Sequence, residues 1–259
     1  MADDTITLAF HTTLWKRPRL TELVLEHLVR VREQAKPNIL TPIVAVVSPD
    51  EDPDSLVLAR RYADHVVEWP NRPVGAKNNA GGRACYELGC DGLMTIGSDD
   101  FIGVGWVRRA AMALQRGAVA ATLPGCAYLV SGRPPFYIRG STHAGSDQWA
   151  MDQRALPMVG AGRVYGREML EATKGELWPG SNNTGLDTGA YCNTVDHWRR
   201  GLVYVWDGSL PPVLDVKTRG GITPASRLAM SAAEELPDWW ACAVFGQEVQ
   251  DAIEELSCD

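Results

Sequence analysis

The stretch GLMTIGSDDFIGVGW, residues 92–106, contains an apolar run that ends in two adjacent carboxylates. Residues 93–96 have the composition of a buried strand, and Asp99 and Asp100 follow shortly after it. Two neighbouring carboxylates repel each other and resist ionisation unless a cation or hydrogen-bond donors compensate them. The pattern therefore predicts a strand whose carboxyl end holds a cation. A simpler alternative is that Ser98, Asp99 or Asp100 caps the helix that follows.

On both sides of this strand, the first half of the chain alternates apolar, strand-like runs with helix-like segments. The strands are predicted at residues 6–10, 43–47, 65–68, 93–96 and 119–123, and the helices at 19–34, 55–62, 75–88 and 106–115. This alternation predicts an α/β fold with a mostly parallel sheet covered by helices on both faces. Ligands of such sheets bind beyond the carboxyl ends of the strands, which groups residues 11–13, 48–54, 71–78 and 97–100 around one crevice.

The second half of the chain is less regular. Residues 131–152 are rich in Gly, Pro and Ser, which predicts a loop with at most one short strand. Later elements are expected at residues 164–170, 187–200, 203–206, 213–216 and 239–256. Because no repeat or linker interrupts the chain, we expect one domain over residues 1–259, with 1–123 binding the ligand and 124–259 forming a variable second half.

The composition excludes several classes of protein. A formal net charge of −7 argues against a chain that coats nucleic acid or an anionic membrane. The six cysteines show no C-x-x-C spacing, and the N-terminus does not resemble a signal peptide. No apolar run approaches the ~20 residues that cross a bilayer. We therefore expect a cytoplasmic protein without a membrane span.

The order of these loops resembles that of the inverting family-2 glycosyltransferases of GT-A fold. FHTTLWKRPRL (residues 10–20) is similar to their first strand, which a Thr-containing loop and an Arg-Pro follow. NRPVGAKNNAGGRA (71–84) resembles a helix that opens with Gly and Lys-Asn, and MTIGSDDFI (94–102) resembles the strand that ends in the acidic metal motif. A later match, over 159–191, is looser, and the resemblance covers roughly residues 5–220.

This resemblance implies a GT-A fold, a Rossmann-like fold of nucleotide-diphospho-sugar transferases, with Mn²⁺ or Mg²⁺ as cofactor. Residues 1–123 would then be the nucleotide-sugar-binding half, and residues 124–259 the acceptor-binding half with a C-terminal helix. The metal would be held by Asp99 and Asp100, and the donor would be a nucleoside-diphosphate sugar, with a UDP-sugar favoured. The expected donor-binding residues are His11, Thr12, Thr13, Arg17, Ser48, Asp50, Lys77, Asn78, Ser98, Asp99 and Lys217.

Two positions depart from the family's pattern. The family usually carries an Asp at the end of its second strand, near the nucleobase, whereas this chain has Ser48, so Asp50 or Asp52 would take that role. The first acidic position of the metal motif is Gly97. The plain alternatives for the other residues are a polar helix start at Lys77 and Asn78, a simple turn after the first strand, and a surface lysine at residue 217.

Inverting transfer also needs a base beside the acceptor hydroxyl. Asp187, in NTGLDTGAY, lies where the resemblance expects an acidic residue, although it could simply cap a helix. Asp152 is the second choice, and Asp196 is a third candidate inside a predicted helix.

The acceptor is left open among a glycan, a small molecule and a hydroxymethylated DNA base, which would be extruded for reaction. Two other functions compete with sugar transfer. One is a nucleotidyltransferase on a similar sheet, although FHTTLWKRPR lacks the glycines of a phosphate loop. The other is a noncatalytic GT-A-like protein that binds nucleotide sugars, which the presence of Ser48 and Gly97 makes plausible.

Overall fold

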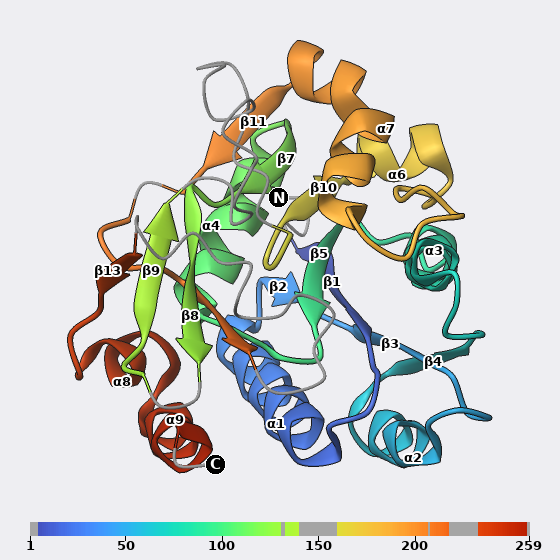
Figure 1. Ribbon diagram of the computed structural model, residues 1–259. Coiled ribbons are helices and arrows are strands. Elements are labelled where there is room, and N and C mark those ends of the chain that lie inside the picture. Colours follow the sequence, from blue (N-terminus) through green and yellow to red (C-terminus); the bar gives the residue numbers. More distant parts are fainter. Residues whose placement is uncertain (1–4, 131–132, 140–159, 207, 218–232, 258–259) are drawn as a thin grey trace.

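The computed structural model describes residues 5–130, 133–139, 160–206, 208–217 and 233–257, which form two β-sheets with helices packed against them (Figure 1). The central sheet has eight strands. In spatial order they are β11 (Leu202–Val205), β7 (Ala118–Thr122), β10 (Val164–Gly166), β5 (Gly92–Gly97), β1 (Ile6–Thr13), β3 (Ile43–Val47) and β4 (His65–Glu68), with β2 (Ile39–Leu40) beside β1.

The second sheet has five strands, and eight helices are described. The strands are β13 (Ala233–Glu235), β9 (Phe136–Arg139), β8 (Gly125–Val130), β12 (Val213–Lys217) and β6 (Asp100–Ile102). The helices are α1 (Pro18–Ala35), α2 (Pro53–Tyr62), α3 (Val74–Glu87), α4 (Val104–Gln115), α6 (Arg167–Thr173), α7 (Leu186–Arg200), α8 (Trp240–Phe245) and α9 (Gln247–Ser257).

The predicted α/β fold with a mostly parallel central sheet is confirmed. β1 pairs in parallel with β3 and β5, β3 with β4, and β11 with β7. Only β10, inserted between β5 and β7, runs antiparallel to its neighbours in this sheet. All five residues of β3, IVAVV, are buried, as expected for a strand covered on both faces.

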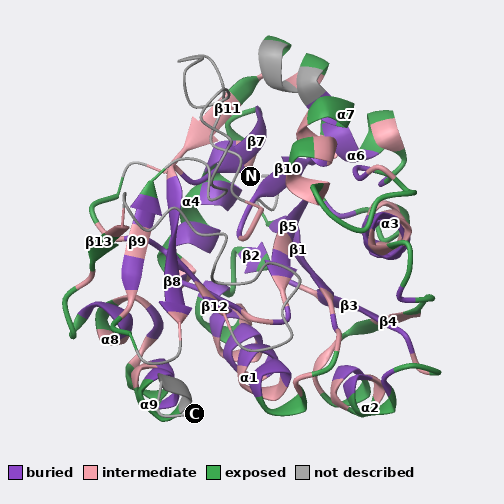
Figure 2. Ribbon diagram, viewed as in Figure 1, coloured by how far each residue is buried: buried purple, intermediate pink, exposed green. Residues whose placement is uncertain are grey.

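Helices cover both faces of the central sheet. The larger core cluster joins α1 and α4 to one face, through residues such as Leu28 and Trp106. The smaller cluster joins α3, α6 and α7 to the other face, through residues such as Cys85, Leu170 and Ala190. Figure 2 shows the resulting pattern on α1, whose buried side faces the sheet while its other side is mostly half-buried and is exposed only near the two ends of the helix. None of the helices among the described residues is long and apolar enough to cross a lipid bilayer.

The chain passes from one sheet to the other at the carboxylates. β5 ends at Gly97 in the central sheet, and β6 begins at Asp100 in the second sheet. Asp99 therefore lies at the junction of the two sheets, beyond the carboxyl end of β5. The second sheet was not predicted, because its strands are short and come from distant parts of the chain. Both sheets draw strands from residues 1–123 and from 124–259, so they do not follow that division.

Three expected elements differ in detail. Residues 164–170 were expected to form one element, but they form β10 and then α6. Residues 239–256 form two helices, because the chain turns at Gly246 with a φ of +99°. Asp100 begins a short strand and does not cap α4, whose N-cap is Gly103.

The glycines of α3 serve close packing. A Cβ atom added at Gly75 would overlap the carbonyl oxygen of Pro179, and one at Gly82 would overlap that of Gly175. Between them, Asn79 exchanges two hydrogen bonds with the backbone of Trp178, at 2.8 and 2.9 Å. Gly75, Asn79 and Gly82 are spaced to lie on one side of the helix. This side of α3 is therefore fitted against the segment that leads to α7.

We expect Gly75→Ala to lower the free energy of unfolding by roughly 1–3 kcal/mol, because the added methyl group has no space. Gly105→Ala is the matched control. Both glycines are the second residue of a helix, but a Cβ atom at Gly105 has no neighbour within 4 Å. The control should therefore be neutral or stabilising by up to about 1 kcal/mol. Urea unfolding measures both, and equal effects would contradict the packing described for α3.

Candidate functional site

Three carboxylates meet at the junction of the two sheets. Ligand oxygens of Asp99, Asp100 and Asp215 all lie within 4.8 Å of one another. The register of the second sheet produces this meeting, because β12 pairs with β6 so that Asp215 lies opposite Asp100. The backbone NH of Val216 donates to the carbonyl of Asp99 at 2.9 Å and fixes the third member beside them.

Two cations flank this cluster, which we call the carboxylate triad. Arg17 Nη1 donates to Asp99 Oδ2 at 2.9 Å, and Lys217 Nζ forms an ion pair with Asp215 Oδ2. The second oxygen of Asp215, Oδ1, is buried and has no hydrogen-bond partner among the residues that the structure describes. Unpaired buried carboxylate oxygens are costly, so this atom is suited to a further cation.

Burial governs the charge of the triad. It raises the pKa of Asp100 well above its usual range, and the neighbouring Asp215 and Asp99 raise it further. Burial also raises the pKa of Asp215, to about 6, because the attraction of Lys217 offsets only part of it. For Lys217, burial disfavours the charged form, but Asp215 and Asp99 outweigh it and raise the pKa. A bound divalent cation would favour the ionised form of all three carboxylates.

Gly97 provides the space that the triad needs. Its backbone NH donates to Asp100 Oδ2 at 2.5 Å. A Cβ atom at this position would lie 2.7 Å from Asp99 Oδ1 and 2.9 Å from Asp100 Oδ2, closer than real contacts allow. The glycine that replaces the first acid of the family's motif thus accommodates the other two, while Asp215 brings a third carboxylate from another strand. An all-oxygen donor set of this kind fits Mg²⁺ or Mn²⁺.

The loop between β1 and α1 closes over the triad in an unusual backbone conformation. Lys16 and Arg17 have φ values of +55° and +54°, in a region of backbone conformation that residues other than glycine rarely adopt. Arg17 is held there by Asp99 and by Ser98, whose Oγ accepts from Nη2 at 3.0 Å. The backbone NH of Lys16 donates to Asp52 Oδ2. Such conformations cluster at functional sites and persist only where surrounding contacts impose them.

Lys77, on α3, contacts the same loop between β1 and α1. Its side chain is 1% exposed, and Nζ donates to the carbonyl of Leu14 at 2.7 Å and to Asn71 Oδ1 at 3.3 Å. Nζ also lies 5.5 Å from the centre of the Trp15 ring. Burial lowers the pKa of this lysine to about 8, although Asp52 and Glu51 oppose the shift. The contacts of Lys77 are thus with the loop that carries Arg17.

The residues expected to contact the nucleoside at the end of β1 are divided between two faces of the sheet. His11 is buried between α3, at Gly81, and Trp178, on which its ring stacks at 5.2 Å. Thr12 is fully buried and, being the next residue along the strand, points to the opposite face. Thr13 is half-buried at the end of β1, level with Gly97. Of these three, Thr13 lies at the crevice.

Several residues expected to contact the nucleotide already form hydrogen bonds within the protein. Ser48 is buried and its Oγ donates to the carbonyl of Trp69 at 2.8 Å. Asp52 is buried as the N-cap of α2, accepting from the backbone NH and the hydroxyl of Ser55. Asp50 is exposed after β3. Asn78 donates to Val74 within α3 at 3.0 Å. Asp50 is thus the candidate whose carboxylate remains exposed.

Asp187 lies in the first turn of α7, but it does not cap that helix. The N-cap is Gly185, and no side chain forms a capping hydrogen bond there. The Asp187 carboxylate lies over Gly160, where an added Cβ atom would overlap it. Asp196 is exposed further along α7, and Asp152 lies outside the described residues. The helix-capping alternative for Asp187 is therefore wrong, while its role as a base stays a prediction.

Asp215 is the member of the site that the sequence did not assign. The strand VLDVK alternates, with Leu214 and Val216 buried on one side and Asp215 and Lys217 on the other. An acid two residues before a lysine in an apolar strand is a visible signal. What the sequence does not contain is the pairing of β12 with β6, which brings Asp215 to Asp100.

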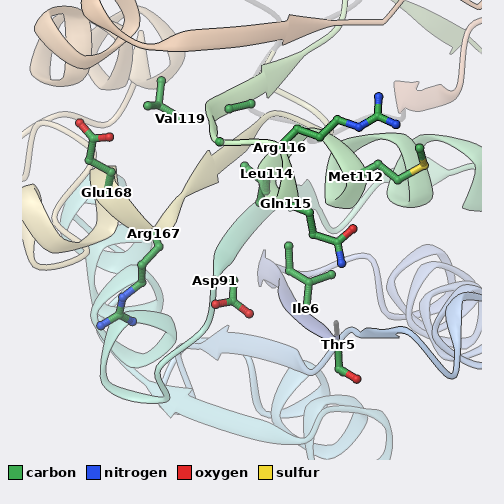
Figure 3. Close-up of a pocket in the computed structure, with 12 residues that line it drawn as sticks. Thr5, Ile6, Asp91, Met112, Leu114, Gln115, Arg116, Val119, Arg167 and Glu168 are labelled. Atoms are coloured by element: carbon green, nitrogen blue, oxygen red, sulfur yellow. The ribbon is translucent and has the colours of Figure 1, made fainter. Parts of the chain in front are cut away.

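A separate hollow of about 680 Å³ lies at the opposite edge of the central sheet, where the parallel strands begin (Figure 3). Thr5 and Ile6 at the start of β1, Asp91 before β5 and Arg167 and Glu168 in α6 line it, together with the turn before β7. Arg167 and Asp91 are engaged in hydrogen bonds with the backbone of Tyr86, Cys90 and Thr7. This hollow is remote from the triad and shares no residue with it.

Known proteins resemble this chain in fold but not detectably in sequence. No family model matches the chain, and no curated protein sequence does. A crystal structure described as a mycobacterial protein aligns with 82% of this chain and 65% of its own, at 15% identity and a TM-score of 0.50.

Two named enzymes align less well. Glucosyl-3-phosphoglycerate synthase from Mycobacterium tuberculosis, in complex with Mn²⁺, UDP and glucosyl-3-phosphoglycerate, aligns with 77% of this chain and 69% of its own, at 16% identity and a TM-score of 0.48. 4-Diphosphocytidyl-2C-methyl-D-erythritol synthase from Anaerococcus prevotii aligns with 79% and 87%, at 10% identity and a TM-score of 0.44. The predicted α/β fold with a mostly parallel central sheet is thus shared with a solved structure, and the identities extend no further than the fold.

Proposed function

We propose that this protein is a metal-dependent glycosyltransferase that moves a sugar from a nucleoside-diphosphate donor, preferably a UDP-sugar, to an acceptor hydroxyl with inversion. The observation that carries the proposal is the carboxylate triad, which lies beyond the carboxyl ends of β1 and β5 with a cation on each side. Ligands of parallel sheets bind at this edge. Three carboxylates and two flanking cations match the needs of a bound metal and a diphosphate.

Asp99, Asp100 and Asp215 would hold Mn²⁺ or Mg²⁺, whose chemistry at such a site is to offset the negative charge that builds on the leaving diphosphate. Arg17 and Lys217 are each paired with one triad carboxylate. When a donor and its metal bind, these two side chains can turn from the carboxylates to the phosphate oxygens. Arg17 offers a planar fork for this contact and Lys217 a point charge.

Asp187 is the proposed base. The acceptor oxygen forms a bond to the sugar's anomeric carbon as the bond from that carbon to the diphosphate breaks, and the diphosphate leaves with the electron pair. The hydroxyl proton passes to the Asp187 carboxylate. Arg163 links Asp187 to β5. Its Nη1 donates to the carbonyl of Asp187 at 3.1 Å, and its own carbonyl accepts from the backbone NH of Thr95 at 2.8 Å. Thr95 lies on β5, two residues before Gly97.

The decisive experiment is calorimetric titration with a panel of nucleotide sugars, with and without Mn²⁺. We expect UDP-sugars to bind in the presence of Mn²⁺ and to lose most of their affinity when the metal is chelated, since the triad and the diphosphate share the ion. Binding that is equal with and without metal would exclude the metal role of the triad. Binding without transfer to any acceptor hydroxyl would favour the noncatalytic alternative.

A further inference from the structure

Arg163, immediately before β10, is a buried cation that forms no ion pair with the described residues. The side chain is 1% exposed. Nη1 donates to the hydroxyl of Tyr165 at 3.2 Å and to the carbonyl of Asp187 at 3.1 Å. No carboxylate among the residues that the structure describes lies within ion-pair distance of the guanidinium. A full positive charge thus rests on two neutral partners.

The unpaired part of this guanidinium is one particular edge. Nε and Nη2 are both buried, and neither has a hydrogen-bond partner within the described part of the chain. These two nitrogens form the side of arginine that binds a carboxylate or a phosphate with two parallel hydrogen bonds. This edge of the guanidinium therefore has the donor geometry that suits an anion.

Arg163 belongs to a row of polar residues on the face of the central sheet that α3 and α7 cover. His11 on β1 is the register partner of Thr95 on β5, and the backbone NH and hydroxyl of Thr95 both donate to the carbonyl of Arg163. The Nδ1 atom of His11 is also buried, and no described residue forms a hydrogen bond with it. Thr95 and Asp187, which contact Arg163, are half-buried. The guanidinium thus lies one layer below the surface, and Thr95 lies two residues before Gly97.

A buried, unpaired charge weakens the fold unless it is compensated. Hydrophobic or neutral polar residues would fill the same space at lower cost, so an arginine at this position calls for a compensating partner. Strain and unsatisfied groups of this kind are typical of sites that bind ligands.

We propose that the Nε–Nη2 edge of Arg163 binds an anionic group, a carboxylate or a phosphate, that one of the two substrates carries. The proposal rests on the proposed function for the identity of those substrates, but the anion site itself does not depend on it. The anionic group would sit over the row of His11, Thr95 and Arg163, beside the end of β5. Arg163 is then a specificity-determining residue that selects for a charged substrate.

Thermal unfolding in the presence of sodium malonate or inorganic phosphate tests the site directly. We expect either anion, at concentrations well above its dissociation constant, to raise the midpoint of the wild-type protein by roughly 2–4 °C or more. Arg163→Met should abolish this rise. In buffer without these anions its midpoint should equal or exceed that of the wild type, because an unpaired buried charge has been removed.

Arg167→Met is the matched control. It lies four residues further on, but its guanidinium is satisfied by Glu171 at 2.8 Å and by the carbonyls of Tyr86 and Cys90 at 3.3 Å. Its loss should lower the midpoint and leave the response to anions intact. Should Arg163→Met fail to fold, Arg163→Lys keeps the charge and removes the two-nitrogen edge, and it should lose most of the response.

Two results would overturn the proposal: a wild-type midpoint that neither anion moves, or equal shifts in the wild type and in the Arg163 variants. To find which substrate carries the anionic group, the affinities of UDP-glucuronate and UDP-glucose are measured in the presence of Mn²⁺. Selective loss of UDP-glucuronate affinity in Arg163→Met places the anion on the donor sugar, whereas unchanged affinity for both places it on the acceptor. If no UDP-sugar binds but malonate raises the unfolding midpoint only of proteins that retain Arg163, the proposed function fails and the anion site stands.

Discussion

Asp187→Asn is expected to lower the rate of sugar transfer by roughly a hundredfold or more while donor binding stays normal. Asn has the shape of Asp and fits over Gly160 in the same way, but it cannot accept the proton of the acceptor hydroxyl. Since Asp187 forms no capping hydrogen bond, the substitution should change the melting temperature little. The measurement is transfer at saturating donor, combined with calorimetric donor affinity and thermal unfolding.

Asp196→Asn is the control for this variant, because it removes a carboxylate from the exposed side of the same helix. It should transfer at the wild-type rate. A slow Asp196→Asn variant, or near-normal turnover by Asp187→Asn with the true acceptor, would show that the base lies elsewhere. Asp152→Asn would then be the next variant to examine.

Asp99→Asn is expected to reduce the affinity for Mn²⁺ by at least roughly 10- to 100-fold. Loss of a residue that only supports a metal ligand already costs that much, and Asp99 is a proposed ligand. The reason is that the amide keeps the size of the side chain but removes one negative charge from the triad. Asp215→Asn should have a similar effect, which separates a true three-carboxylate site from one built on Asp99 and Asp100 alone. Free Mn²⁺ measured by electron paramagnetic resonance during titration reports the affinity without any nucleotide.

Asp54→Asn is the matched control, since Asp54 is an exposed carboxylate in the first turn of α2 and does not belong to the triad. Its Mn²⁺ affinity should equal that of the wild type. Asp215→Asn leaves Lys217 without its carboxylate partner, so circular dichroism should verify that this variant is folded. Full Mn²⁺ affinity in folded Asp99→Asn and Asp215→Asn would remove the metal from the proposal.

The sequence alone determined the parallel part of the central sheet and the edge of it at which Asp99 and Asp100 lie. Short apolar runs such as that of β3, alternating with the amphipathic pattern of α1, are local signals that survive folding unchanged. Asp99 and Asp100 could be assigned to the end of β5 for the same reason, because the strand that precedes them is itself readable. Arg17 and Lys217 were also predicted near this edge, and the structure pairs each with a triad carboxylate.

Only the tertiary structure decided which of the polar residues meet. Asp215 joins the triad through the pairing of β12 with β6, and no local pattern encodes a register between strands so far apart in the chain. Lys77 is polar and begins a helix, which suits either a ligand or solvent, yet packing buries it beneath the loop that holds Arg17. The unpaired edge of Arg163 is likewise a property of its surroundings. Periodicity reports which face of an element is buried, whereas contacts between elements depend on packing of the whole chain.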